Sequence, residues 1–341
     1  MTAFEKTILV TGGAGFIGSN FIFGLERRRP EIRVIDLDLL TYAAHPQVWE
    51  AQKTMPGVVP VRGDICDTAL VASLLERFDV TGIIHFAAES HVDNSISNPQ
   101  GFVRTNVLGT ASLLTAAVRV WKKKGVLGSA RFHHVSTDEV YGALGPEGFF
   151  VESTPYAPSS PYSASKASSD LLVRAFGRTY GLNYTISNCS NNFGPWQHAE
   201  KLIPTVIRKA LAGEPVPIYG TGANVRDWLW VGDHCRAIES IFFDAAPGET
   251  FNVGGHGERG NLEMARSLCA LLDRLSPRPD GRPYAAQIAF VSDRPGHDFR
   301  YAIDPSKIER ELGWRPGLTF EQALERTVRW YLGEGRALLS P

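Results

Sequence analysis

The chain has 341 residues, of which 43% are apolar and 21% are charged. This composition is typical of a globular protein, and the length is sufficient for about two domains. The formal net charge is −1, so the chain lacks the excess of positive charge with which proteins bind nucleic acid or an anionic membrane. We therefore expect neither nucleic acid nor a membrane as a partner.

The cysteines and the N-terminus both favour a cytoplasmic location. The four cysteines are scattered without a CxxC spacing, at Cys66, Cys189, Cys235 and Cys269. Neither a zinc site nor a disulfide framework is indicated. The first residues run into an apolar strand without the features of a signal peptide, and no apolar run approaches the ~18 residues of a membrane span. His91, His133 and His134 also lack ligand spacing, so we expect no metal site.

The first predicted strand, residues 7–11, is followed at once by a glycine-rich loop. Gly12, Gly15 and Gly18 have the spacing GxxGxxG and open an apolar helix that is predicted to end near Arg28. Glycines permit a tight turn and a close approach of the backbone to a pyrophosphate, which lies at the N-terminus of the helix. Because an acidic strand end follows about 20 residues later, the sequence predicts a dinucleotide site.

The acidic strand end is RVIDLD, residues 33–38. A carboxylate at this position accepts hydrogen bonds from the ribose hydroxyl groups of adenosine and repels a 2′-phosphate, so the sequence favours NAD over NADP. We expect Asp38 to take this role. Asp36 is the alternative, because both side chains lie on one face of the strand.

Two further strands continue a regular alternation of strands and helices. The strand in residues 58–67 carries Asp64 near its end, which is expected either to meet the adenine amino group or to cap the following helix, 68–78. The next strand, 82–90, ends in small residues and leads into a long helix over 102–121. This alternation predicts an α/β fold with a Rossmann-like, doubly wound parallel sheet.

A strand that begins at His133 carries polar side chains at its end. The sequence HHVSTDEVYG places Thr137, Asp138 and Glu139 directly after an apolar run. In an open parallel sheet, ligands bind at this end of the strands. We therefore expect these three side chains in the functional site.

A second long helix, residues 161–180, opens with SPYSASK. Ser160 is a suitable N-cap, and Tyr162 and Lys166 lie one turn apart on one face of the helix. A lysine beside a phenol favours the phenolate, so Tyr162, with an ordinary pKa near ~10, is expected to act as a base near neutrality. The spacing YxxxK is common by itself and gains meaning from the polar strand end before it.

The alternation becomes irregular after residue 190. The sequence predicts a hairpin-like piece near residues 218–231, one more strand at 251–255 and a C-terminal helix from Phe320 to about Leu332. We expect an NAD-binding domain in residues 1–190. Residues 191–341 are expected to form a smaller, mixed α/β substrate lobe, with an approximate and discontinuous boundary.

Taken together, several motifs resemble the extended short-chain dehydrogenase/reductase superfamily and, within it, the dTDP-glucose 4,6-dehydratase family. The motifs are TGGAGFIG, HFAAESHVD, STDEVYG, YSASK, NCSNNFGP, KLIP, PIYGTGANVRDWL and DRPGHDFRYAID, in this order along nearly the whole chain. STDEVYG is the most diagnostic, because related epimerases and decarboxylases have the glycine motif and YxxxK but lack the Asp-Glu pair. One stretch departs from the family: TYAAHPQVWEAQ stands where a TYAGN-like sequence is expected.

The resemblance implies a role for each catalytic side chain. Tyr162, supported by Lys166, takes the proton of the sugar 4-hydroxyl group while hydride passes to NAD, and Thr137 hydrogen-bonds that hydroxyl group. Glu139 then removes the C5 proton, and protonated Asp138 donates to the departing 6-hydroxyl group. Two adjacent carboxyl groups with different tasks require surroundings that separate their pKa values.

The resemblance also implies the binding residues. NAD is expected to contact Gly12, Gly15, Phe16, Ile17, Gly18, Asp38, Thr41, Asp64, Ile65, Ala87, Ala88, Thr105, Tyr162, Lys166 and Asn192. The sugar nucleotide is expected to contact Ser90, Thr137, Asn191, Lys201, Leu202, Arg226, Asn261, Arg294 and His297. The cations among the latter suit a diphosphate.

The sequence leaves two alternative functions open besides that of a dehydratase, and it also predicts how the chain assembles. The first alternative is another NAD-dependent enzyme of sugar nucleotides, a 4-epimerase or a decarboxylase. The second is a catalytically inactive NAD-binding sensor. The helices 102–121 and 161–180 carry more apolar surface than one sheet face requires, and family members pair through such helices, so a homodimer with a four-helix bundle is expected.

Overall fold

The computed structural model describes residues 4–293 and 298–339 and is built around one parallel sheet. Its strands are β1 (Lys6–Thr11), β2 (Ile32–Asp38), β3 (Val58–Arg62), β4 (Gly82–His85), β5 (Arg131–Thr137), β6 (Tyr184–Cys189) and β11 (Thr250–Val253). They lie in the order β11-β6-β5-β4-β1-β2-β3, and every neighbouring pair is parallel. The predicted doubly wound α/β fold is therefore confirmed.

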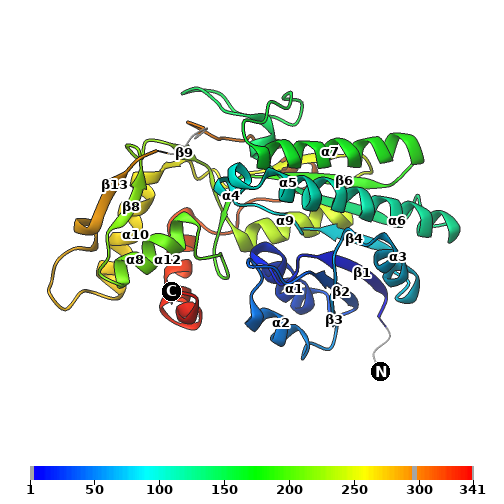
Figure 1. The fold of residues 1–341 in the computed structure, drawn as a ribbon, viewed down its shortest axis with the longest axis horizontal. Coiled ribbons are helices and arrows are strands. Elements are labelled where there is room, and N and C mark those ends of the chain that lie inside the picture. Colours follow the sequence, from blue (N-terminus) through cyan, green and yellow to red (C-terminus); the bar gives the residue numbers. More distant parts are fainter. Residues whose placement is uncertain (1–3, 294–297, 340–341) are drawn as a thin grey trace.

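Helices cover both faces of this sheet (Figure 1). The helices of this part are α1 (Phe16–Arg28), α2 (Pro46–Gln52), α3 (Thr68–Arg77), α6 (Gly109–Lys123), α7 (Pro161–Tyr180) and α9 (Val231–Asp244). Buried side chains of α3, α6 and α7 pack on one face around Leu9, whereas those of α1 and α9 pack on the other around Ile8 and Val10. Adjacent residues of β1 thus face opposite layers, as the alternation of side chains in a strand requires.

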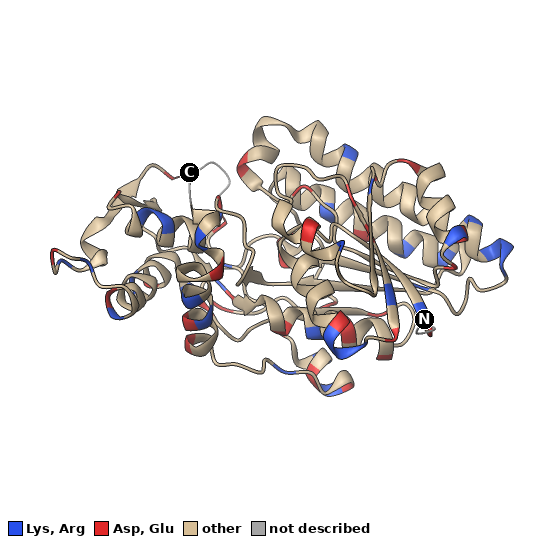
Figure 2. Cartoon of the chain, turned by 90° about the horizontal axis from the view of Figure 1, so that it is seen from below, with Lys and Arg blue, Asp and Glu red and all other residues tan. Residues whose placement is uncertain are grey.

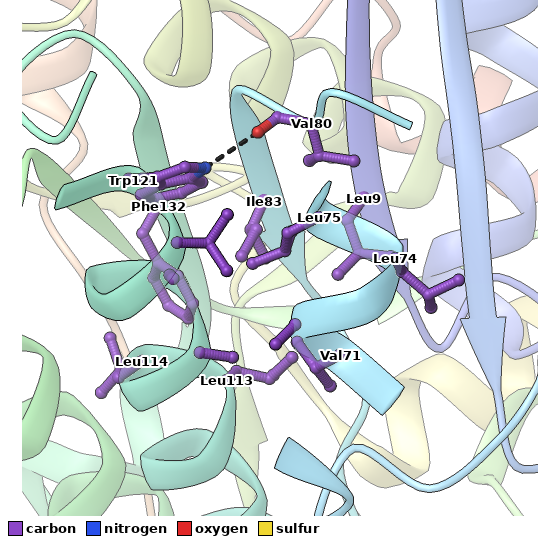
Figure 3. Close-up of a cluster of buried hydrophobic side chains, with 14 of the residues drawn as sticks. Leu9, Val71, Leu74, Leu75, Val80, Ile83, Leu113, Leu114, Trp121 and Phe132 are labelled. Atoms are coloured by element: carbon purple, nitrogen blue, oxygen red, sulfur yellow. Dashed lines mark hydrogen bonds between the residues drawn. The ribbon is translucent and has the colours of Figure 1, made fainter. Parts of the chain in front are cut away.

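The core under α3 and α6 is a cluster of buried apolar side chains (Figure 3). Trp121 is fully buried there, and its indole Nε1 donates a hydrogen bond to the Val80 carbonyl oxygen at 2.8 Å. The polar atom of this large side chain is thereby satisfied without water. This packing holds α6 against the sheet and fixes the start of the helix near the strand ends.

The helix predicted over 102–121 differs in its first turns. The structure has α4 (Val92–Ser97), α5 (Pro99–Phe102), a π-helical stretch at Val103–Leu108 and only then α6. Asn106, in the π-helical stretch, is buried and clamps the loop after β4: its Oδ1 accepts from the Glu89 N–H at 2.9 Å, and its Nδ2 donates to the Glu89 carbonyl oxygen at 3.0 Å. The wider π-helical turn directs the polar side chain of Asn106 inward. A regular α-helical periodicity does not predict this position.

The second lobe contains three small two-stranded sheets and helices. Its elements are β7 (Asn191–Phe193), α8 (Leu202–Leu211), β8 (Val216–Tyr219), β9 (Val225–Arg226), β10 (Trp228–Trp230), β12 (Arg259–Gly260), α10 (Asn261–Leu275), β13 (Ile288–Val291), α11 (Ser306–Leu312) and α12 (Phe320–Leu332). β8 pairs with β13, β9 with β12 and β10 with β7. The predicted hairpin is therefore wrong, because these successive strands each pair with a distant segment and not with one another.

The lobe is interleaved with the large sheet. α9 packs beneath the sheet, and β11 extends it by pairing with β6, although both come from residues after 190. α8, α10 and α12 enclose a separate core around Phe193 and Met264. The large sheet is thus completed by elements from the second half of the chain.

Charged residues are distributed evenly over the protein. Figure 2 shows positive and negative residues interspersed along helices and loops, in keeping with the net charge of −1. Among the described helices, none combines the length and the apolar character that crossing a bilayer requires.

Candidate functional site

A cavity of about 350 Å³ lies at the carboxyl edge of the large sheet. Its walls come from the loops after β1, β2, β3 and β4, from the end of β5, from the start of α7 and from residues 189–201. Every residue that the sequence assigned to NAD binding or to catalysis lines this cavity. The structure therefore brings these residues together, while their individual roles stay predictions.

The glycine loop has the shape that a pyrophosphate requires. Gly12 has a φ of +76°, and a Cβ atom there would lie 2.8 Å from the Ala87 backbone. At Gly18, a Cβ atom would lie 2.3 Å from the Gly12 carbonyl oxygen. Gly15 caps α1 without a side chain, so the first N–H groups of this helix are available to an anion. These residues fit NAD.

The two candidate carboxylates of β2 have different positions. Asp38 lines the cavity and accepts hydrogen bonds from the Ala14 N–H at 3.0 Å and the Leu40 N–H at 2.7 Å. Asp36 is fully buried below the loop, where its Oδ1 accepts from the Gly13 N–H at 2.9 Å. Asp38 is therefore the carboxylate that faces the cavity, where the sequence predicts NAD, and Asp36 supports the glycine turn.

Asp64 also faces the cavity and does not cap a helix. It accepts hydrogen bonds from the Cys66 N–H at 2.8 Å and from Arg104 at 3.3 Å. Partial burial raises the pKa of Asp64, but these hydrogen bonds outweigh it and hold the pKa below its usual value. The cap of α3 is Asp67, whose side chain accepts from the Leu70 N–H. The capping alternative for Asp64 is thus wrong.

The catalytic candidates stand where β5 ends. The Thr137 hydroxyl group accepts from the Glu139 N–H and donates to the Asp138 Oδ1, both at 3.3 Å. Asp138 to Tyr141 then form a single 3-10 turn. This turn places two consecutive carboxyl groups in the cavity wall directly beside the threonine.

The surroundings of Asp138 favour its neutral form. Its side chain is almost completely buried, whereas Glu139 is half-buried. Burial, followed by the nearby Glu139 and Asp227 carboxylates, raises the pKa of Asp138 well above its ordinary value. A protonated carboxyl group at neutral pH can donate a proton, as the sequence analysis expected of Asp138.

Tyr162 and Lys166 both line the cavity, but the protein does not favour a phenolate. Burial, then the Glu139 carboxylate, raises the pKa of Tyr162 well above its ordinary value. The Lys166 Nζ donates to the Val135 carbonyl oxygen at 2.8 Å. Burial thus opposes the expected phenolate, and the roles of Tyr162 and Lys166 as base and supporting cation stay predictions.

The residues predicted to hold the sugar nucleotide are only partly gathered in the cavity. Ser90, Asn191 and Lys201 line it, and the Lys201 Nζ donates to the Ser90 carbonyl oxygen at 3.1 Å. Leu202, Arg226 and Asn261 lie outside its described wall. Arg294 and His297 lie outside the described residues.

Arg226 is occupied by the protein itself. Its guanidinium group is buried over the Tyr301 ring, 4.3 Å from the centroid, and donates to the Val225 carbonyl oxygen at 2.7 Å and the Asp298 carbonyl oxygen at 3.0 Å. It therefore braces the segment that follows residue 297. Contact with a diphosphate stays a prediction for this residue.

Several cavity residues escaped the sequence analysis. They come from strand ends and loops that were recognised, but the side chains were not singled out: Arg104, Ser136, Cys189, Ser190, Gln197, His198 and Glu200. Cys189 is the last residue of β6, so its place at the carboxyl edge was the available signal. Within residues 4–293 and 298–339, no group of three or more His, Cys, Asp or Glu side chains is placed to hold a metal ion.

Comparison with known proteins gives consistent matches over nearly the whole chain. The family model described as GDP-mannose 4,6 dehydratase matches residues 9–327. A dTDP-glucose 4,6-dehydratase of Xanthomonas campestris pv. campestris (strain B100) is 56% identical over 328 residues, which cover 96% of this chain and 93% of the relative.

Solved structures agree with this match. The crystal structure of DesIV, a dTDP-glucose 4,6-dehydratase from Streptomyces venezuelae with NAD bound, has a TM-score of 0.88 and 46% identity, covering 97% of this chain and 98% of DesIV. A dTDP-glucose 4,6-dehydratase from Bacillus anthracis in complex with NAD has a TM-score of 0.86 and 41% identity, covering 98% of this chain and all of that chain.

The Asp36 carboxyl group below the glycine turn predicts a pH-dependent stability. Burial, and then Asp38, raises the pKa of Asp36 to about 8 from 3.8. Between these values the folded protein holds a proton that the unfolded chain releases, so Asp36 contributes less stability as the pH rises. Relative to Asp36→Asn, the free energy of unfolding of the wild type should fall by up to ~1.4 kcal/mol per pH unit between about pH 5 and 8.

Urea unfolding at several pH values measures this difference. Asp67→Asn is the matched control, since it makes the same change at an exposed helix cap. Parallel stability curves for the wild type and Asp36→Asn would show that Asp36 is ionised in the folded protein.

Proposed function

Since the chain belongs to the dTDP-glucose 4,6-dehydratase family, we propose that it is the hydro-lyase that converts dTDP-glucose to dTDP-4-keto-6-deoxyglucose, a reaction of deoxysugar biosynthesis. One observation carries this proposal beyond the family match. A buried Asp138, whose raised pKa favours its neutral form, and a more exposed Glu139 lie side by side in the cavity that also holds Tyr162, Lys166 and the glycine loop.

NAD fits the glycine loop and Asp38, and the chemistry that it supplies when bound is the reversible acceptance of a hydride. Bound there, NAD would supply a place to hold the hydride from C4 until it returned to C6, so the site would need to retain it through the cycle. A site that encloses the nucleotide on several sides suits a cofactor that stays bound. Among the described residues, the adenosine side is enclosed by Asp38, Thr41, Asp64 and Ile65.

In the proposed reaction, Tyr162 takes the proton of the sugar 4-hydroxyl group and Thr137 orients that group. Burial keeps the phenol neutral, so a cation in the cavity is required before the phenol can act as a base. We assign this task to Lys166, which lies one helical turn after Tyr162. The resulting 4-ketone makes the C5 hydrogen acidic.

Glu139 and Asp138 then divide the elimination of water between them. Glu139 removes the C5 proton, and Asp138 donates its proton to the departing 6-hydroxyl group. The two roles need opposite protonation states, and the deeper burial of Asp138 supports this division.

The reaction product tests the proposal. Incubation of the protein with dTDP-glucose and NAD should yield a 4-ketone that absorbs near-ultraviolet light in alkali. A 4-epimer without a ketone, or release of carbon dioxide from a UDP-uronic acid, would instead favour the alternative enzymes. NAD binding without turnover of any sugar nucleotide would favour the inactive sensor. Comparing kcat/KM for dTDP-, UDP-, CDP- and GDP-glucose would identify the preferred nucleobase.

We also propose that the protein is a homodimer that pairs through a four-helix bundle of α6 and α7. The outer surface of these helices and the adjoining turns carries large exposed apolar side chains, at Val103, Leu108, Leu171 and Tyr180. Exposed apolar residues that gather on one surface are characteristic of a protein interface.

A cytoplasmic location is proposed as well, because all four cysteines are free. Burial raises the pKa of Cys66 and of Cys269 to about 11, which keeps both thiols protonated and unreactive. A fusion to a reporter enzyme that is active only after export from the cytoplasm tests this location. The reporter should remain inactive.

The dimer proposal predicts that Leu171→Glu yields a monomer. Leu171 is 58% exposed on α7, so the substitution should spare the fold while placing two charges against each other across a symmetric interface. Light scattering after size exclusion would measure the mass. Phe290→Glu on β13 is the control, since it removes an equally exposed apolar side chain, 59% exposed, at the opposite end of the molecule (Figure 1). A dimeric Leu171→Glu protein would contradict this interface.

The division of labour predicts a specific defect in Glu139→Gln. Oxidation at C4 should continue while the loss of water stops, so NADH absorbance at ~340 nm should rise on mixing, and product formation should fall by at least ~100-fold. Glu147→Gln, the same change in an exposed loop, should behave as the wild type. Normal dehydration by Glu139→Gln would show that another group removes the C5 proton.

A further inference from the structure

A fully buried carboxylate lies beneath the catalytic lysine, outside the cavity wall. Asp170 is on α7, one turn after Lys166, and none of its side chain is exposed. Its Oδ2 accepts hydrogen bonds from the Ser136 hydroxyl group at 2.9 Å and from the Tyr156 hydroxyl group at 2.8 Å, and the Asn188 amide lies at 3.4 Å. A buried carboxylate held by several donors is stabilised in its charged form.

The imidazole ring of His134 lies close to both this carboxylate and Lys166. The His134 Nε2 lies 3.2 Å from the Asp170 Oδ1 and 3.4 Å from the Lys166 Nζ. Both His134 and Lys166 are buried. An ammonium group in such a dry place is costly unless an opposite charge is near, and Asp170 is the carboxylate on the same helix that provides it.

We propose that Asp170 is a positioning residue that keeps Lys166 charged and fixed beneath Tyr162. This inference rests on the proposed function, in which the Lys166 ammonium enables Tyr162 to accept a proton. Asp170 itself does not line the cavity and touches no reacting atom. It acts through Lys166 by charge and through Ser136 and Asn188 by position.

The charge balance around Lys166 supports this role. Burial lowers the pKa of Lys166, and the Asp170 carboxylate opposes this shift. Burial likewise raises the pKa of Asp170, but the hydrogen bond and charge of His134, together with Lys166 and Ser136, outweigh it and hold the pKa below its usual value. The titratable groups around the lysine come from α7, β4, β5 and β6: Tyr162, Asp170, His85, His134 and Cys189.

Replacement of Asp170 by asparagine should therefore shift the pH dependence of the reaction. Without the carboxylate, Lys166 loses its proton at lower pH, so the alkaline limb of the kcat profile should move down by about one pH unit or more. At pH 8, kcat should fall by at least ~10-fold and should recover in part as the pH is lowered toward 6. The measurement uses the full chain with saturating NAD and dTDP-glucose.

Tyr156→Phe is the matched control. It removes a hydrogen bond to the same Oδ2 atom but leaves the charge of Asp170, so its alkaline limb should coincide with that of the wild type. An Asp170→Asn profile that is reduced by the same factor at every pH, with an unmoved alkaline limb, would overturn the proposal and leave Asp170 a structural role. An inactive wild type at every pH would instead contradict the proposed function.

A stability measurement gives a second test, in which a folded double variant is the expected result even if Asp170→Asn alone does not fold, and a double variant that also fails to fold would overturn the proposal. Lys166→Met leaves Asp170 buried without its cation, whereas Lys166→Met/Asp170→Asn removes both charges. The double variant should fold and have a higher Tm than either single variant, because the two buried charges depend on each other. Destabilisations that simply add would overturn the coupling between Asp170 and Lys166.

Discussion

The parallel register between β5 and β6 is the constraint on which the cavity depends. It sets Ser136 opposite Asn188 and Thr137 opposite Cys189. Because successive side chains of a strand face opposite sides, this register directs Ser136 and Asn188 to the Asp170 carboxylate and brings Thr137 to the cavity wall. If the pairing of β5 with β6 shifted by one residue, the side chains that face Asp170 would no longer lie opposite one another.

Desolvation by the surrounding sheet and helices then decides the charge of each group. Burial raises the pKa of both Asp138 and Tyr162, which favours their neutral forms, and it lowers the pKa of Lys166. A dry site thus provides an acid without further help but does not provide a base. This asymmetry explains why the buried carboxylate of Asp170 is needed on the far side of the lysine, where it does not compete with a ligand for space.

Local sequence patterns predicted the parts of the site that depend on local rules. The glycine loop, the acidic end of β2 and the helix that begins at Pro161 each follow from a turn, a strand end or a cap within a few residues. Asp38 could be preferred over Asp36 on the same grounds. In the described structure, all the predicted NAD residues meet in one cavity because parallel strands end at one edge.

Features that depend on distant contacts could not be predicted in this way. The π-helical turn is accompanied by the contacts of Asn106 with the loop after β4, and the strands of the second lobe pair with segments up to about 70 residues away. In the sequence, Asp170 resembles any polar residue on a helix. Its role depends on contacts with β5 and β6, which the sequence does not show. Arg226 has the chemistry of a phosphate ligand, but in the described structure its guanidinium group packs on the Tyr301 ring and donates to backbone carbonyl groups.

The contribution of β11 to the large sheet has a consequence for truncated forms of the protein. A chain cut after residue 190 would retain the glycine loop and the predicted catalytic side chains, yet β6 would become a bare edge with unpaired backbone groups where β11 pairs with it. It would also lose α9, which shields Ile8 and Val10. Such a fragment would expose both a strand edge and an apolar face, the combination that promotes aggregation, so residues 1–190 are not expected to fold by themselves.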